Sequence, residues 1–237
     1  GARGDDSLSG GFDADTLSGG LGDDVIDGGT GVDLASYADA TEAVIVDLGA
    51  GSSDGAHGVD VLRNIENVIG GEGDDHIIGN DIANLLIGGN GADTLEGGDG
   101  DDSLVGGDGV DSLDGGLGND TLDLGAGDNE FAVGGEGDDS LFAGSGSGQI
   151  LYGDNEDGTG SGNDTLVAGS GIDQILIGGN GDDSLIGGLG NDVFVLEDEN
   201  VGHDSFFGGS GTDELRIDAA GPLALDWLVL SAASGVE

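Results

Sequence analysis

Aspartate recurs every nine residues along most of the chain, each time after a glycine-rich stretch. In GGDGDDSLV, residues 97–105, the sixth residue is Asp102 and the eighth is Leu104. Near-copies flank it, GGNGADTLE before and GGDGVDSLD and GGLGNDTLD after. Carboxylate oxygens and the main-chain carbonyls that glycines leave accessible are the ligands that hard cations such as calcium prefer. The spacing therefore indicates repeated metal binding.

The repeat reads G-G-x-G-x-D-x-U-x, where U is a large apolar residue. The sixth position supplies the candidate metal-ligating aspartates Asp6, Asp15, Asp24, Asp33, Asp75, Asp93, Asp102, Asp111, Asp120, Asp139, Asp164, Asp173, Asp183, Asp192 and Asp213. Glycines at positions two and four are the candidate carbonyl donors, clearest at Gly20, Gly22, Gly89, Gly91, Gly98, Gly100, Gly107, Gly109, Gly116 and Gly118. The sixth position lacks a carboxylate at Asn84, Asn129 and Gly148, and no calcium ion is expected at the Gly148 turn, which contains no acid at all.

The nine-residue period predicts an all-β fold. Glycine at three positions in nine disfavours a helix, whereas x-U-x alternates as a strand does and the head of each unit has turn chemistry. Two units are expected to form one coil of a parallel solenoid, with the U side chains stacked inside. The predicted inner residues are Leu8, Leu17, Ile26, Ala35, Ile77, Leu86, Leu95, Leu104, Leu113, Leu122, Phe131, Leu141, Ile150, Leu166, Ile175, Leu185, Phe194 and Leu215.

Charge explains why such a solenoid needs metal. Asp plus Glu number 50 against 3 Lys plus Arg, and the formal net charge is -47. Stacking aligns these carboxylates, and a divalent cation in each turn would neutralise them. A polyanion of this kind is not expected to bind nucleic acid or an anionic membrane. The composition, with 56 Gly and no Cys, also allows disorder in the metal-free state.

These tandem nonapeptides resemble the RTX (repeats-in-toxin) calcium-binding family of secreted bacterial toxins, proteases, lipases, epimerases, adhesins and surface-layer proteins. The resemblance implies a right-handed parallel β-roll with two strands per coil, calcium in the turns and a C-terminal cap. One turn would supply carbonyl oxygens to each ion, and the turn two units later would supply its Asp. It also implies type I secretion of an unfolded chain that folds on calcium outside the cell, or at its surface. Roughly a dozen ions are expected from six-to-eight-oxygen sites.

Changes in repeat phase indicate how the chain is organised. They predict β-roll repeats at 1–36, an interrupting segment at 37–69, further repeats at 70–195 with an insertion at 152–163, and a C-terminal repeat and cap at 196–237. Within the interruption, EAVIVDLGAGSS fits a strand that ends in a turn, and VDVLRNIENVI fits a strand or a short helical turn. The insertion partly resembles an EF-hand loop, but Gly153 stands where the first ligand acid belongs. We therefore expect a surface loop there, with an extra calcium ion as the alternative.

The apolar stretch from Phe194 to Leu230 fits either a terminal cap or an interface with another domain or copy. No apolar run approaches the ~18 residues of a transmembrane helix, and no basic-then-apolar leader opens the chain, so a fragment or processed chain is expected.

The sequence predicts no enzyme activity within these residues. It contains neither G-x-S-x-G nor H-E-x-x-H, and paired acids such as Asp101 and Asp102 should diverge, one to metal and one to solvent. The first hypothesis is a non-catalytic calcium-folded module of a surface-layer, adhesin or matrix protein, with calcium ions, further copies or neighbouring domains as partners. The alternative is the C-terminal calcium-binding and secretion module of a secreted enzyme or toxin.

Overall fold

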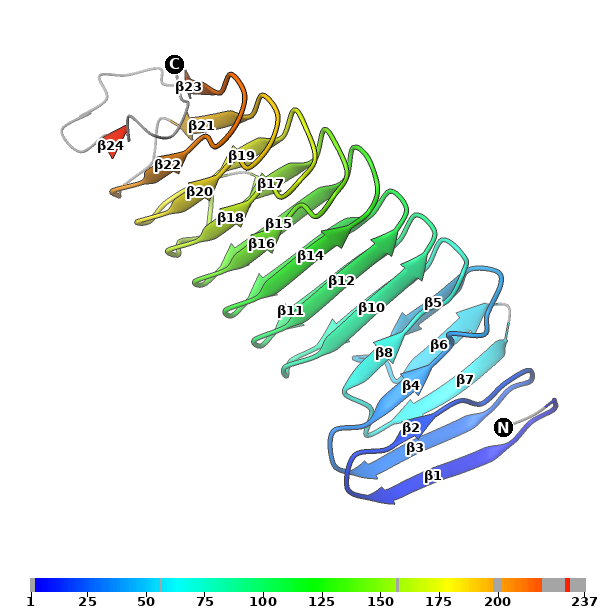
Figure 1. The fold of residues 1–237 in the computed structure, drawn as a ribbon. Helices are drawn as coiled ribbons and strands as arrows, with labels where there is room; N and C mark the ends of the chain where they lie inside the picture. The colour runs from blue at the N-terminus through cyan, green and yellow to red at the C-terminus, as the bar shows by residue number, and fades with distance from the viewer. Residues whose placement is uncertain (1–2, 56, 157, 198–201, 219–228, 231–237) are drawn as a thin grey trace. The chain divides into compact units, whose positions relative to one another are not determined.

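The computed structural model describes residues 3–55, 57–156, 158–197, 202–218 and 229–230 (Figure 1). Over these residues the regular elements are β-strands, and no helix occurs among them. Accordingly, this part of the chain has no helix long and apolar enough to cross a lipid bilayer. The chain forms two compact units, Gly1–Ser112 and Leu113–Glu237. Each unit is a parallel β-roll, which confirms the predicted fold class.

Unit 1 contains two sheets. Strand neighbours in its first sheet follow the order β1 (Ser7–Phe12), β3 (Val25–Thr30), β7 (Gly58–Arg63), β6 (Ser52–Gly55), β5 (Val44–Asp47), β9 (His76–Asn80) and β11 (Thr94–Asp99). The second sheet follows the order β2 (Thr16–Leu17), β4 (Leu34–Ser36), β8 (Asn67–Ile69), β10 (Leu85–Asn90) and β12 (Ser103–Asp108). Successive repeats therefore alternate between the two sheets.

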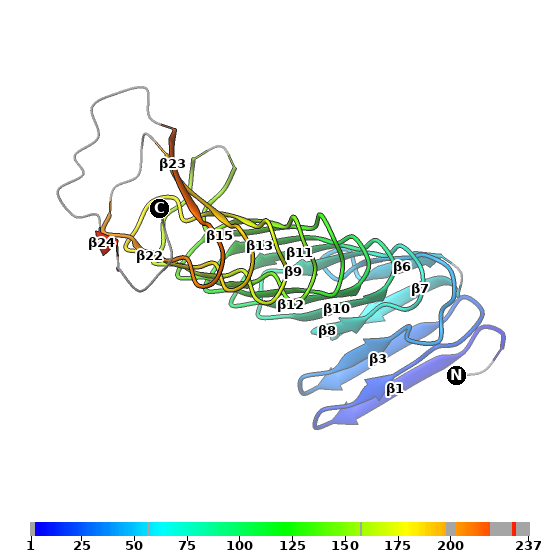
Figure 2. The same cartoon turned by 45° about the horizontal axis from the view of Figure 1, so that its top comes forward.

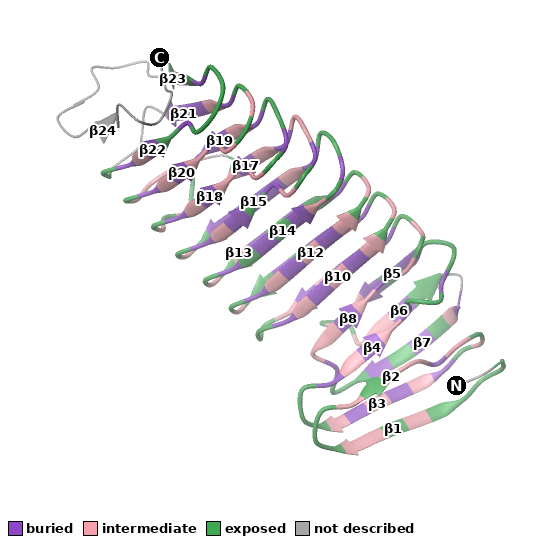
Figure 3. Cartoon of the chain, viewed as in Figure 1, coloured by how far each residue is buried: buried purple, intermediate pink, exposed green. Residues whose placement is uncertain are grey.

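The strand register places equivalent repeat positions side by side. In the parallel pair of β10 and β12, Leu86 lies opposite Leu104, and Gly89 lies opposite Gly107. Leu86, Leu95 and Leu104 are fully buried, whereas their strand neighbours are more exposed, as the alternating colours of Figure 3 show. The core of the roll is thus a stack of eighth-position side chains between two sheets, with two nonapeptides per coil as predicted.

An antiparallel excursion interrupts the repeats of unit 1. Strand β5 pairs antiparallel with β6, and β6 pairs antiparallel with β7. The two outer strands of this three-stranded group pair with strands of the roll: β7 runs parallel to β3, and β5 runs parallel to β9. The stretch left open between strand and helical turn forms strands β7 and β8. The interruption therefore adds rungs to one sheet.

Unit 2 continues the same alternation of sheets, and Figure 2 shows its successive coils. One sheet has the order β13 (Ser112–Leu117, beginning at the last residue of unit 1), β15 (Phe131–Glu136), β17 (Ile150–Tyr152), β19 (Ile175–Ile177), β21 (Val193–Glu197) and β23 (Glu214–Asp218). The other has the order β14 (Thr121–Gly125), β16 (Ser140–Phe142), β18 (Thr165–Val167), β20 (Ser184–Ile186), β22 (Ser205–Phe207) and β24 (Val229–Leu230).

Three predicted inner residues of unit 2 are wrong by one position. The structure buries Ala132, Leu151 and Leu176 where the repeat phase predicted Phe131, Ile150 and Ile175. The cause is one extra residue in each preceding turn. The φ angles of Asn129, Gly148 and Asp173 are +61°, +74° and +61°, so a left-handed residue absorbs the extra length before the strand begins.

The end of unit 2 continues the roll where it is described. Strand β23 pairs parallel with β21, and β22 pairs parallel with β20. Phe194 and Phe206 face each other inside, with ring centroids 5.7 Å apart. Within the predicted cap, residues 198–201, 219–228 and 231–237 lie outside the described residues, so the cap stays a prediction.

Candidate metal sites in the turns

The sixth-position aspartates form an inner ladder along the turns. In most of them the Oδ1 atom accepts the backbone N–H of the inner residue one coil earlier. Asp6 donates to Asp24 at 2.7 Å, and Asp164 donates to Asp183 at 2.9 Å. The same bond reaches Oδ1 of Asp33, Asp93, Asp102, Asp111, Asp139, Asp164, Asp192 and Asp213. One carboxylate oxygen per turn is therefore fixed by the backbone.

The second oxygen of many of these carboxylates is buried without a hydrogen-bond donor. This holds for Oδ2 of Asp15, Asp24, Asp33, Asp93, Asp139, Asp164, Asp183, Asp192 and Asp213. A buried anionic oxygen with no donor is costly unless a cation or a proton neutralises it. These oxygens are therefore the positions at which a bound cation would be most stabilising.

Eight of these nine oxygens lie against the first glycine of their own unit. A Cβ on Gly10 would lie 2.5 Å from Asp15 Oδ2 and 2.6 Å from the carbonyl oxygen of Gly28. A Cβ on Gly187 would meet Asp192 Oδ2 at 2.7 Å and the Gly208 carbonyl oxygen at 2.6 Å. Carboxylate and carbonyl oxygens from different coils thus converge where only glycine fits, a donor set that suits calcium.

Burial raises the pKa values of these carboxyl groups. The pKa of Asp164 rises to about 8, mainly through desolvation and further through the Asp183 and Asp139 carboxylates. Desolvation likewise raises the pKa of Asp93 and Asp183 to about 7. Without a cation, the turns therefore resist carrying their full negative charge.

Backbone carbonyls must complete any metal site. Within the described part of the chain, no group of three or more His, Cys, Asp or Glu side chains converges as a metal cluster. All ten glycines predicted at positions two and four have positive φ, from +92° at Gly20 to +157° at Gly109. Such backbone is accessible to glycine at no steric cost, and it gives these turns their shape.

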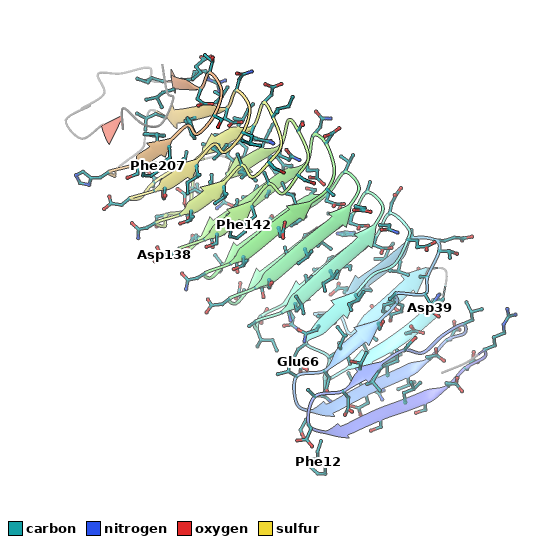
Figure 4. All side chains as sticks on the ribbon, in the orientation of Figure 1. Phe12, Asp39, Glu66, Asp138, Phe142 and Phe207 are labelled. Atoms are coloured by element: carbon teal, nitrogen blue, oxygen red, sulfur yellow. The ribbon has the colours of Figure 1, made fainter. Side chains whose placement is uncertain are left out.

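A second, outer ladder runs along the exposed fifth positions with opposite polarity. Asp138 donates its backbone N–H to Asn119 Oδ1 at 2.8 Å and accepts the N–H of Asn163 at 2.8 Å. Figure 4 shows Asp138 at the exposed rim of the turns. His203 likewise donates its backbone N–H to Asp182, and this bond lowers the pKa of the Asp182 carboxyl. Paired acids do diverge, but the outer one also joins neighbouring coils.

Amide side chains replace the carboxylate in some turns. Gln149 and Gln174 occupy the inner position that the sequence assigned to Gly148 and Asp173, and both are fully buried. Gln149 donates Nε2–H to the carbonyl of Gly127 at 2.7 Å, and Gln174 does so to that of Gly146 at 2.8 Å. Asn84 similarly donates Nδ2–H to the Glu66 carbonyl at 2.7 Å. An N–H donor thus lies beside a turn carbonyl in these units.

Asp173 does not occupy an inner position, contrary to its assignment as a metal ligand. Its side chain is exposed, because the extra turn residue shifts Gln174 inward. Asp6 is also exposed, although its backbone joins the inner ladder. The remaining thirteen predicted aspartates are inner turn residues, and Asp15 is the one among them that is only half-buried.

Four inner acids among the described residues were not predicted from the sequence. Glu130, which is 1% exposed, takes the inner position that the sequence assigned to Asn129. Asp60 accepts the Asp24 N–H at 3.0 Å, Glu66 accepts the Asp33 N–H at 2.7 Å, and Asp204 accepts the N–H of Asp183 at 3.1 Å. Each stands two residues before a buried apolar residue, as in D-V-L and D-S-F. That acid-x-apolar triplet could have identified them without a complete nonapeptide.

Hydroxyl groups donate hydrogen bonds to the inner acid of the interrupting segment. The Tyr37 hydroxyl lies 3.0 Å from Asp60 Oδ2, and the Ser53 hydroxyl lies 3.1 Å from the same oxygen. All three side chains are buried, and burial raises the pKa of Tyr37, so its hydroxyl keeps its proton. This turn therefore satisfies its carboxylate with protein donors.

Comparison with known families agrees with this geometry. The model of the RTX calcium-binding nonapeptide repeat matches more than half of the chain, at residues 1–35, 64–95, 87–122, 96–131, 124–157, 159–194 and 200–216. The chain belongs to the RTX calcium-binding repeat family. No curated protein matches it. As an RTX β-roll, it is a calcium-binding module, and the unmatched residues 36–63 include the antiparallel excursion.

Proposed function

We propose that this RTX module is a non-catalytic, calcium-folded scaffold of a protein secreted to, or held at, the bacterial cell surface, of surface-layer, adhesin or matrix type. The observation that carries the proposal is the set of buried Oδ2 atoms without donors, which for Asp15, Asp33, Asp139, Asp164 and Asp192 lie beside both a glycine and a carbonyl oxygen of another coil. Calcium binding at these positions removes the energetic penalty of stacking the turns.

The coupling of folding to calcium follows from mass action. A ligand that binds only the folded state stabilises it as its concentration exceeds the dissociation constant. Extracellular calcium modules bind with dissociation constants of about 10⁻⁴–10⁻³ M. At cytosolic calcium the chain then stays unfolded and competent for export, and it folds outside.

The histidines support a structural role. His76 Nε2 lies 2.9 Å from Glu96, and His203 Nδ1 lies 3.1 Å from Asp182, both at exposed positions. His57 is buried beside the ring of Tyr37, with centroids 6.1 Å apart. Each histidine thus has its own local environment, and none shares a site with another, as expected for structural or solvated side chains.

Circular dichroism tests the proposal directly. The chain should show the spectrum of an unfolded chain in chelator and a β-sheet spectrum in millimolar calcium, with magnesium at the same concentration as the control. The same β-sheet spectrum in chelator and in calcium contradicts calcium-coupled folding. A roll that forms equally well with magnesium contradicts the assignment to calcium.

A further inference from the structure

A buried carboxylate outside the repeat pattern lies at the start of the insertion in unit 2. Asp154 follows β17 and stands where the other units carry the second glycine of the turn. It is only 3% exposed, and Gly160 of the returning loop and Gly179 of the next coil both lie against its side chain. The inner acid of the same unit is Asp164, so Asp154 adds a second buried carboxyl group to one turn.

The two oxygens of Asp154 have different surroundings. Its Oδ2 accepts the backbone N–H of Asn180 at 2.6 Å. Its Oδ1 is buried and has no hydrogen-bond partner. No ion pair to Asp154 occurs among the residues that the structure describes. One oxygen is thus fixed by the next coil, and the other lacks a donor.

Other polar atoms converge on the space that this free oxygen faces. A Cβ built on Gly160 would lie 3.3 Å from Asp154 Oδ1, 2.7 Å from the carbonyl oxygen of Gly135 and 3.4 Å from Asn155 Nδ2. The oxygen and nitrogen of an asparagine amide are interchangeable by rotation, so Asn155 can present its oxygen instead. Carboxylate, carbonyl and amide oxygens then surround one small space.

The electrostatic setting favours a cation in that space. Burial raises the pKa of Asp154, and the negative charge of Glu136 raises it further. Both effects show that an additional positive charge would be stabilising here. Magnesium demands near-ideal octahedral geometry, whereas calcium accepts irregular sets of oxygen ligands such as this one.

We propose that Asp154 Oδ1, the Gly135 carbonyl and the Asn155 amide oxygen form an additional calcium site, separate from those of the repeat aspartates. It uses no sixth-position residue, and it ties the insertion to the preceding coil through Gly135. The insertion is then a calcium-stabilised loop, and its site can be present or absent independently of the repeat sites.

Counting ions on the intact chain tests this site. Native mass spectrometry in calcium should show one calcium ion fewer on Asp154→Asn than on the wild type. The amide retains an acceptor for the Asn180 N–H and can donate to the Gly135 carbonyl, as Gln149 does to Gly127, so the variant should fold. Glu156→Gln is the matched control, because it removes one exposed charge from the same loop and should keep the full count.

An equal number of ions on Asp154→Asn and on the wild type overturns the proposal. Anomalous X-ray scattering from wild-type crystals grown in calcium gives a readout that does not depend on the variant. A peak between Asp154 and Gly135 is expected. Peaks in the repeat turns but none at this position reject the additional site alone, whereas no peaks anywhere reject the proposed function.

Discussion

At the scale of single residues, the inner side chain of each turn decides how that turn is neutralised. A carboxylate such as that of Asp164 leaves one buried oxygen for a cation. An amide such as that of Gln174 instead donates to a neighbouring carbonyl at 2.8 Å. We therefore expect the same backbone to support turns that depend on calcium and turns that do not, and the two kinds should respond differently to substitution.

Asp164→Asn should raise the calcium concentration needed for folding several-fold. The amide keeps an acceptor for the Asp139 N–H but removes the anionic ligand, at a cost of about 1–3 kcal/mol in saturating calcium. In chelator the variant should be no less stable than the wild type, because a costly buried charge is gone. Calcium titrations followed by circular dichroism measure both effects. Asp173→Asn, at an exposed position, is the control and should leave the midpoint unchanged.

Gln149→Met should destabilise the roll at every calcium concentration. The substitution leaves the Gly127 carbonyl without its amide donor inside a buried turn, at a cost of about 1–3 kcal/mol. Urea unfolding at two saturating calcium concentrations, together with ion counting, measures the change. The number of bound ions should remain that of the wild type, and loss of an ion on this substitution would show that the turn does bind calcium.

At the scale of elements, the antiparallel excursion of unit 1 supplies hydroxyl donors to its inner acid. Strand β6 brings Ser53 and strand β7 brings Asp60, while Tyr37 reaches them from the end of β4. Asp60 still accepts the backbone N–H of Asp24, so the inner ladder passes through the excursion. The excursion therefore preserves the stacking of the roll, with protein donors to both oxygens of the Asp60 carboxylate.

Tyr37→Phe should lower the free energy of unfolding by about 1–3 kcal/mol, because Asp60 Oδ2 loses a donor in a buried site. Chemical unfolding in saturating calcium measures the loss. The calcium count should be unchanged. Ser53→Ala removes the other hydroxyl and should act in the same direction, so full stability in both variants would contradict a structural role for this cluster.

The nine-residue period was sufficient to predict the coil, the parallel register and most of the core. Leu104 and Leu113 are buried where the period places them, because every complete unit has the same length. The period failed to predict the inner residue where a turn gained one residue, at Asn129. Neighbouring residues at the start of the following strand are all apolar, so either of two adjacent positions could have been the inner one. Burial of the whole coil, which no local pattern reveals, selected Ala132 over Phe131.

The partners of the interrupting segment could not be predicted for a related reason. An acid such as Asp60 carries the same local pattern whether a metal ion or a hydroxyl neutralises it. Only the tertiary fold brings Tyr37 and Ser53 to it from 23 and 7 residues away. Sequence periodicity therefore finds candidate turns, whereas the neighbouring coils determine which of them are free to bind calcium.

At the scale of the whole molecule, protons and calcium compete for the same buried carboxylates. In the calcium-free roll, burial raises the pKa of Asp93, Asp139 and Asp183 to about 7, and that of Asp164 to about 8, from an ordinary value of 3.8. Between pH 3.8 and 8 the folded chain thus binds more protons than the unfolded chain. Its stability without calcium must fall as the pH rises through this window.

Calcium reverses this pH dependence, because its binding displaces those protons. The calcium midpoint of folding should therefore be lower at pH 8 than at pH 6, whereas the calcium-free chain, unfolded near neutral pH, should show more β-structure at pH 5 than at pH 8. Circular dichroism titrations at each pH measure both trends. Repeating them in high potassium chloride separates the buried groups from the overall charge of -47, since salt screens exposed carboxylates far more than buried ones. A calcium midpoint independent of pH in high salt would show that buried aspartates do not hold the ions.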